Sequence, residues 1–424
     1  MKKVILSTMI ISSSLLSFGQ SAIKYPATKK IDKVDVYFGN SIPDPFRWLE
    51  DDRSAETAEW VKEQNKVTFD YLAAIPFRNT IKARMEKLWN YEKVSAPFKE
   101  GDYTYYYKNN GLQNQSVLYR KDAKGAEELF LDPNTFSKDA TTSLDGVSFS
   151  KDGSLVAYSI SEAGSDWRKV IFIDAKTKQS IGEPLVDVKF SGLSWKGNEG
   201  IFYSSYEKPK GSELSAKTDQ HRLFFHKLGT KQAEDAILFG DQEKRRYVGG
   251  YVSDDNRYLF ISAANSTSGN ELYLKDLSVP NSPIVAIHKG FEYDVDVLDN
   301  IGTTLFIVTN LKAPNKRIVT VDVANPGVEN WKDLIPETEQ VLNPSTGAGY
   351  IFANYMKDAV SVVKQFDYKG KLIRTIALPG VGTASGFGGK AKDKELYFSF
   401  TNYVTPGTTY TFFPDSGKSS VYVK

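Results

Sequence analysis

Hydrophobic and polar residues alternate along most of this chain, in a pattern that repeats seven times between residues 98 and 402. Each repeat is an apolar strand, a tight polar turn and a second apolar strand, and the turns recur about every 49 residues. Their centres lie near Gly101, Asp152, Asn198, Asp255, Ile301, Lys357 and Asp393. Repeated strand units of this length are typical of the blades of a β-propeller, because each blade buries its apolar faces against its neighbours. The pattern therefore predicts a mainly β fold, a seven-bladed β-propeller.

A helical pattern precedes the strands. Ser54 is a good helix N-cap, and the apolar residues that follow recur at helical spacing up to Ile75, where Pro76 ends the helix. These residues describe one buried face, made of Trp60, Val61, Val67, Tyr71, Leu72 and Ile75, but the chain offers it no evident partner, because propeller blades pack on each other. A second amphipathic stretch follows, with Ile81, Met85, Leu88 and Trp89 on one side.

The first 22 residues have the features of an export signal. Lys2 and Lys3 form a basic start, the stretch 4–18 is apolar and uncharged, and small residues follow it. The stretch is short for a membrane span and is interrupted by three serines. We expect cleavage between Gln20 and Ala22 and a periplasmic or secreted protein; the alternative is an uncleaved N-terminal anchor.

Composition excludes several classes of function. The chain is 41% hydrophobic and 25% charged, as ordinary globular proteins are, and its net charge of +2 gives no indication of a nucleic-acid partner. It contains no cysteine, so disulfides, thiolate metal sites and a cysteine nucleophile are impossible.

The sequence contains no complete catalytic apparatus. It lacks the Gly-x-Ser-x-Gly pattern that places a nucleophilic serine on a sharp turn. Its three histidines lie in strand-like or connecting segments, so we interpret His221, His226 and His288 as structural rather than catalytic or metal-binding. The stretch 386–391 superficially matches a dinucleotide fingerprint but precedes a strand instead of a helix. We therefore predict no catalytic residue, no metal and no cofactor within this chain.

Several motifs nevertheless resemble one enzyme family. Asp44-Pro-Phe-Arg-Trp-Leu-Glu-Asp51 and Trp60-Val-Lys-Glu-Gln-Asn65 closely resemble the N-terminal signature of the prolyl oligopeptidases. Later segments are similar to successive blade motifs of that family, in the same order: Ser161–Trp167, Val188–Ser191, His226–Thr230, Ser253–Tyr258, Thr309–Pro314, Asn330–Glu337 and Tyr397–Gly407. The resemblance runs from Tyr25 to the end of the chain.

The resemblance implies a serine endopeptidase that cleaves oligopeptides after proline. In that family an α/β-hydrolase domain carries the Ser–Asp–His triad, and the propeller caps and gates it. Residues 23–76 match the short N-terminal piece of the hydrolase domain and residues 77–424 match the propeller. The C-terminal catalytic portion has no counterpart, so we expect a truncated and inactive part of the enzyme. The alternative is a stand-alone, non-catalytic propeller that binds peptides or other partners.

The resemblance also indicates which side chains contact the substrate. Phe190 matches a family aromatic residue that lines an apolar subsite beyond the proline pocket, and Val248 and Ser266 match two further positions of that subsite. The implied partners are an oligopeptide and the C-terminal hydrolase domain, with no nucleic acid and no membrane. The complete protein is expected to be a monomer.

Overall fold

The computed structural model describes residues 23–209 and 218–423. The expected signal segment, residues 1–22, lies outside the described residues. Contacts within the chain divide it into two units, one up to Met85 and one from Glu86 onward. This contact boundary falls within the second helix, whereas the sequence predicts a domain boundary between residues 76 and 77. The assignment of these parts to hydrolase and propeller domains stays a prediction.

The first unit contains a short hairpin and the helices. Its elements are β1 (Val34–Tyr37), β2 (Asn40–Pro43), a 3-10 helix (Arg47–Glu50), α1 (Ala55–Ala73) and the start of α2 (Arg78–Trp89). The Ser54 hydroxyl accepts the Thr57 amide at 3.0 Å, so the predicted N-cap of α1 is confirmed. Arg47 fastens the segment before α1, because its guanidinium pairs with Asp44 at 2.6 Å and also with Asp35.

The apolar face of α1 is only partly covered in the described chain. Thr57 is the one residue of α1 that is buried, whereas Val61, Phe69 and Tyr71 are exposed. The apolar residues of α2, including Met85 and Trp89, are also exposed. Amphipathic spacing predicted both helices correctly, and the sequence gives the apolar face of α1 no evident partner among the propeller blades. Within the described residues, neither helix combines the length and apolarity that crossing a bilayer requires.

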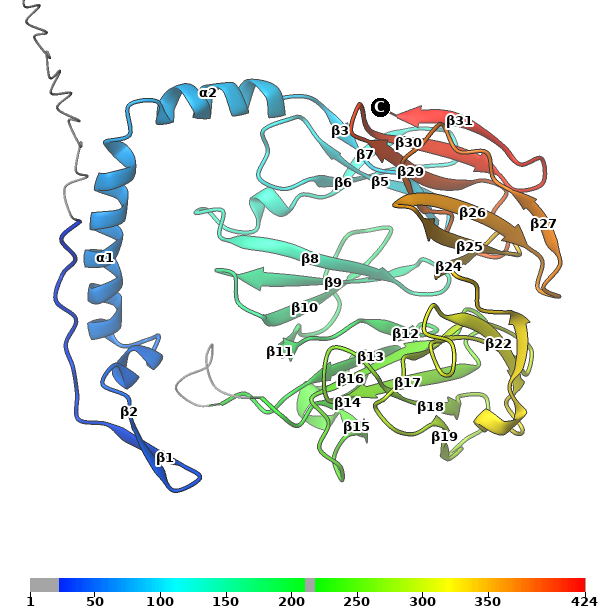
Figure 1. The fold of residues 1–424 in the computed structure, drawn as a ribbon, viewed down its shortest axis with the longest axis horizontal. Coiled ribbons are helices and arrows are strands. Elements are labelled where there is room, and N and C mark those ends of the chain that lie inside the picture. The colour runs from blue at the N-terminus through cyan, green and yellow to red at the C-terminus, as the bar shows by residue number, and fades with distance from the viewer. Residues whose placement is uncertain (1–22, 210–217, 424) are drawn as a thin grey trace, which may run out of the picture. The chain divides into compact units, whose positions relative to one another are not determined.

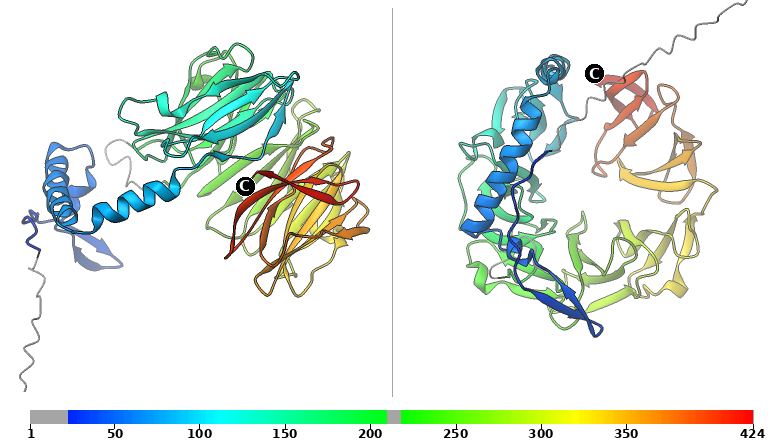
Figure 2. Two further views of the ribbon diagram at one scale, coloured as in Figure 1. Left: turned by 90° about the horizontal axis from the view of Figure 1, so that it is seen from above. Right: turned by 60° about the vertical axis from the view of Figure 1, so that its left-hand side comes forward.

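The second unit contains seven antiparallel sheets, which follow one another around a ring as the colour runs from cyan to red (Figures 1 and 2). We number these blades 1 to 7 along the chain. Blade 1 consists of β3 (Lys93–Val94), β4 (Phe98–Glu100), β5 (Tyr103–Asn109), β6 (Val117–Lys121) and β7 (Glu127–Leu131). Blade 2 consists of β8 (Thr142–Phe149), β9 (Leu155–Glu162), β10 (Trp167–Asp174) and β11 (Leu185–Lys189). Blade 3 consists of β12 (Ser194–Lys196), β13 (Gly200–Ser205), β14 (Arg222–Lys227) and β15 (Ala236–Phe239). Blade 4 consists of β16 (Tyr247–Val252), β17 (Tyr258–Ala264), β18 (Glu271–Asp276) and β19 (Ile284–His288). Blade 5 consists of β20 (Val295–Ile301), β21 (Thr304–Thr309), β22 (Arg317–Asp322) and β23 (Lys332–Ile335). Blade 6 consists of β24 (Val341–Gly347), β25 (Tyr350–Lys357), β26 (Val360–Phe366) and β27 (Leu372–Thr375). Blade 7 consists of β28 (Thr383–Gly386), β29 (Leu396–Asn402), β30 (Thr405–Phe413) and β31 (Lys418–Val423). The predicted seven-bladed propeller is confirmed.

The sequence prediction places the turn of the sixth repeat one strand too late in its blade. The turn at Lys357 joins β25 to β26, the second and third strands of blade 6. In the other four-stranded blades the predicted turn joins the first and second strands, and in blade 6 that turn lies at residues 348–349. The misplaced repeat explains why the last predicted interval is shorter than the others.

Adjacent blades share their apolar cores. Tyr258 and Phe260 of β17, for example, lie in one buried cluster with Leu305 and Ile307 of β21, so blades 4 and 5 are packed face to face. Blade 7 also lies beside blade 1, where the Lys390 ammonium bonds to the Glu100 carboxylate at 2.6 Å (Figure 2). Blade stacking supplies the burial that a single sheet cannot achieve alone.

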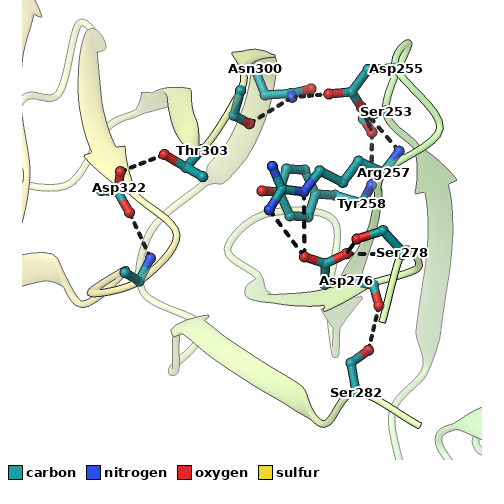
Figure 3. Close-up of polar contacts among 12 residues, drawn as sticks. Ser253, Asp255, Arg257, Tyr258, Asp276, Ser278, Ser282, Asn300, Thr303 and Asp322 are labelled. Carbon is teal, nitrogen blue, oxygen red and sulfur yellow. Dashed lines mark hydrogen bonds and ion pairs between the residues drawn. The ribbon is translucent and has the colours of Figure 1, made fainter. Parts of the chain in front are cut away.

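The polar turns that mark the repeats in the sequence also form hydrogen bonds between neighbouring blades (Figure 3). In blade 4 the Ser253 hydroxyl donates to one oxygen of Asp255, and the other oxygen accepts Asn300 of blade 5 at 2.8 Å. Blade 2 repeats the arrangement, because Asp152 accepts Asn198 of blade 3 at 2.6 Å. Burial alone would raise the pKa of Asp255, but the hydrogen bonds from Ser253 and Asn300 outweigh it and hold the pKa below its usual value. These carboxylates therefore act as charged links between blades.

Candidate functional site

Phe190 lies where blade 2 ends and the chain turns toward blade 3. It follows β11 directly, and its side chain is 47% exposed. Its backbone has a φ of 53°, in the left-handed region that non-glycine residues seldom occupy. Asp187, three residues earlier, also lies in this region, with a φ of 54°. The end of β11 therefore has an unusual backbone that holds a large apolar side chain in solvent.

Aromatic side chains from three consecutive blades meet around Phe190. Its ring lies edge-on to Tyr206, which follows β13 of blade 3, with centroids 6.2 Å apart. It also lies 6.1 Å from Tyr247, the first residue of β16 in blade 4. Trp167, at the start of β10, joins the group through Lys189, whose ammonium lies 4.8 Å from the indole and 5.1 Å from the Phe190 ring. We call Trp167, Phe190, Tyr206 and Tyr247 the aromatic cluster.

A buried histidine ties this cluster together. The His221 ring stacks on Tyr206 at 4.2 Å, and its Nδ1 accepts the backbone amide of Val248 at 2.8 Å. Because Nδ1 accepts, the proton is on Nε2, which donates to the carbonyl of Lys189 at 2.9 Å. One imidazole thus fixes the backbones on either side of the cluster. Burial lowers the pKa of His221 to about 4, even though the bond to Lys189 favours the charged form.

The structure brings the three sequence-predicted site residues to this region, but in different environments. Val248 is 2% exposed, and its side chain belongs to the shared core of blades 3 and 4. Ser266 is exposed in the bend after β17, and its neighbour Asn265 accepts the Arg246 amide at 3.4 Å. Phe190 therefore exposes its side chain to solvent, whereas the side chain of Val248 is buried and its backbone amide donates to His221. Their contact with a substrate stays a prediction.

Several residues of this region were missed or interpreted differently from the sequence. Trp167 is only 8% exposed, as a residue packed within a blade is, but the ammonium groups of Lys189 and Lys208 also lie over its indole ring. Tyr206, His221 and Tyr247 gave no signal as a group, because they lie far apart in the sequence, after β13, before β14 and at the start of β16, and meet only in the folded chain. The one local signal was Phe190 itself, next to a lysine in Val188-Lys-Phe-Ser191.

The other histidines have structural surroundings. His226 is buried and bonds through Nδ1 to Asp235 at 2.8 Å, and the same carboxylate accepts the Tyr203 hydroxyl at 2.9 Å. His288 is buried and its Nδ1 faces the carbonyl of Asn270 at 3.1 Å. Within residues 23–209 and 218–423, no three side chains of the metal-binding types are grouped to hold an ion.

Burial of His221 predicts a pH-dependent stability. The neutral ring is required in the folded chain, whereas an unfolded histidine gains its proton near pH 6.5. Between pH 6.5 and 4 the unfolded chain binds more protons, so stability falls as pH falls through this window. The contribution of His221 is about 3 kcal/mol, present above pH 6.5 and lost near pH 4. Urea unfolding at several pH values should give a shallower pH slope for His221→Gln than for the unmodified chain. Parallel curves for the two chains would contradict this assignment.

Comparison with known proteins agrees with the fold. A family model described as "Prolyl oligopeptidase, N-terminal beta-propeller domain" matches residues 26–424. The chain belongs to this family. It is 58% identical over 406 residues to a protein named "Prolyl endopeptidase" from Elizabethkingia miricola, and 57% identical to one of the same name from Elizabethkingia meningoseptica. Each match covers 95% of this chain and 57% of the relative.

Solved structures give the same result. A structure from a mechanistic study of two prolyl endopeptidases superposes with a TM-score of 0.84 at 29% identity. That match covers 95% of this chain and 60% of the other. Prolyl oligopeptidase B from Galerina marginata, bound to a 35-residue substrate, gives a TM-score of 0.81 at 25% identity and similar coverage. The chain therefore spans a little more than half the length of the relatives that it matches.

Proposed function

We propose that this chain is the N-terminal and propeller part of a serine-type prolyl endopeptidase, which cleaves oligopeptides after proline. The observation that supports the proposal is the match to the family propeller over residues 26–424, together with 58% identity to a prolyl endopeptidase along 95% of the chain. In this proposal the triad lies on a C-terminal α/β-hydrolase domain, the partner of the propeller. The propeller caps and gates the site, so flexible short peptides enter and folded proteins are excluded.

The aromatic cluster is the proposed peptide contact of the propeller. Phe190 supplies an exposed apolar surface, and Val248 and Ser266 flank it on blade 4. Aromatic rings suit this role because they offer a large contact area with little conformational entropy to lose. A peptide whose proline occupies the catalytic centre would place a preceding residue on this surface.

We further propose that the protein is exported to the periplasm or secreted, and that it acts as a monomer. The basic start, the apolar stretch and the small residues before position 23 support export. Mass spectrometry of the N-terminus of the native protein would test the proposed cleavage, and light scattering would test the monomer.

The activity is tested by comparing the native protein that carries this chain with the 424-residue chain alone. The native protein should release the chromophore from a substrate ending in proline, and a serine-directed phosphonate should abolish the reaction. The isolated chain should show no turnover, because the described residues hold no nucleophile–base pair at the aromatic cluster. Turnover by the isolated chain would refute the proposal that the triad lies on a separate hydrolase domain. A native protein that binds proline peptides without cleaving them would instead favour a peptide-binding module.

A further inference from the structure

Lys189 is a buried cation without an anionic partner. The residue is 5% exposed, and among the described residues no carboxylate or carbonyl oxygen is bonded to its ammonium group. Its contacts are instead the ring faces of Trp167 and Phe190, at 4.8 and 5.1 Å. Cation–π contacts offset only part of the cost of removing an ammonium group from water. The ammonium nitrogen is not one of the fully enclosed unpaired atoms of the described chain, so it still reaches solvent and is open to a negatively charged or strongly polar ligand.

Two further cations lie near the aromatic cluster. Lys208 places a second ammonium 5.6 Å from the same indole, where Asp187 pairs with it at 2.8 Å. On the other side of the aromatic cluster, the exposed guanidinium of Arg246 lies 5.8 Å from the Tyr247 ring. Three cations thus adjoin the four rings, and Asp187 is the one carboxylate that is paired with any of them in the described chain. The region combines an apolar surface with an excess of positive charge.

The backbone holds Lys189 in this position from two sides. Its carbonyl accepts His221 Nε2 at 2.9 Å, and the residue pairs with Trp167 in the β10–β11 ladder. The next residue, Phe190, has the left-handed backbone that exposes its ring beside the ammonium. The charged group is consequently fixed at the edge of an exposed apolar surface, where a ligand that covers Phe190 would reach it.

We propose that Lys189 binds a carboxylate of the peptide substrate, so that the protein prefers peptides with an acidic side chain before the proline. This inference rests on the proposed function, and it adds a charged specificity to a subsite for which the resemblance implies apolar contacts. The aliphatic part of a glutamate side chain would cover the Phe190 ring while its carboxylate pairs with the ammonium. Such a bond, shielded from water by the rings, is worth about tenfold or more in specificity.

The test uses the native protein and internally quenched peptides that contain one proline. Glutamate is placed singly at each of the three positions before the proline, and each peptide has a glutamine counterpart. At one of these positions kcat/KM for the glutamate peptide should exceed that for the glutamine peptide by about tenfold. Lys189→Met should bring this ratio close to one, and Lys189→Arg should retain most of it. Lys364→Met is the matched control, because Lys364 also places its ammonium over a ring, Tyr355 at 5.3 Å, but lies in blade 6.

A second measurement separates recognition from a structural role. If Lys189 serves a ligand, Lys189→Met should leave the Tm unchanged or raise it, because an unpaired buried charge is replaced by an apolar chain. Equal rates on both peptides of every pair, a ratio that survives in Lys189→Met, or a lower Tm with both peptides affected equally would overturn the inference. The last result would indicate that Lys189 pairs with another part of the native protein. Failure to cleave even the glutamine peptides would instead overturn the proposed function, and the inference would fall with it.

Discussion

Gly153→Ala is expected to lower the free energy of unfolding by about 3–5 kcal/mol, because two blades meet backbone to backbone at this glycine. Gly153 has a φ of 74°, and a Cβ there would lie 2.2 Å from the amide nitrogen of Gly101 and 2.7 Å from its Cα. Gly101 belongs to the first turn of blade 1 and Gly153 to the first turn of blade 2. A side chain would therefore force the two turns apart, in addition to straining the left-handed backbone.

The control for this prediction is Gly164→Ala in the same blade. Gly164 also has a φ of 74°, but no atom lies within 4 Å of a Cβ built there. This substitution should cost only the strain of the left-handed conformation, about 1–2 kcal/mol. Urea unfolding followed by tryptophan fluorescence would measure both variants. Equal losses would show that blades 1 and 2 do not need this close approach.

The number of blades was predictable from the sequence because the repeat is local. Each blade needs its own tight polar turn between apolar strands, so turns such as those at Asp152 and Asp255 mark the blades directly. The position of a strand within its blade was less predictable. In blade 6 the turn at Lys357 has the same polar character as a first turn, although it joins the second and third strands. Which strand is innermost depends on stacking against the neighbouring blades, and no local pattern records it.

The helices show the same division between local and distant information. The capping of α1 by Ser54 and its end before Pro76 follow from neighbouring residues, and both were predicted. Burial of the apolar face of α1 depends on a partner for which the sequence offers no evident candidate, and in the described chain Val61 and Tyr71 of that face are exposed.

The candidate site was predictable only at single positions. Phe190 was predicted because its position matches an aromatic residue of the family that it resembles, and its ring is half-exposed in the structure. Lys189, Tyr206 and His221 were not found, because their roles arise from contacts between blades 2, 3 and 4. The charge of Lys189 is visible in the sequence, but its burial and its lack of an anionic partner among the residues that the structure describes are not.

Arg120→Met should cost about 3 kcal/mol of stability, because Arg120 joins blades 1 and 2 from a buried position. Its side chain is 2% exposed, and it bonds to Glu128 within blade 1 at 2.6 Å. Across the blade boundary it donates to the carbonyl of Ala175, and to that of Lys176 at 3.3 Å. Its guanidinium also lies 4.0 Å from the Tyr103 ring.

Methionine retains much of the volume of arginine but none of its hydrogen-bond donors. The loss of these donors is why we expect Arg120→Met to lower the free energy of unfolding. Replacing a buried ion pair with apolar groups is often neutral for stability. In Arg120→Met, however, the two backbone carbonyls of blade 2 that accept from Arg120 would lose their donor. Arg168→Met is the control, since Arg168 is less buried and pairs with Asp145 alone at 3.0 Å, so its loss should cost less than about 1 kcal/mol. Urea unfolding of both variants measures the difference. A stability of Arg120→Met equal to that of Arg168→Met would mean that apolar stacking, and not this arginine, holds blades 1 and 2 together.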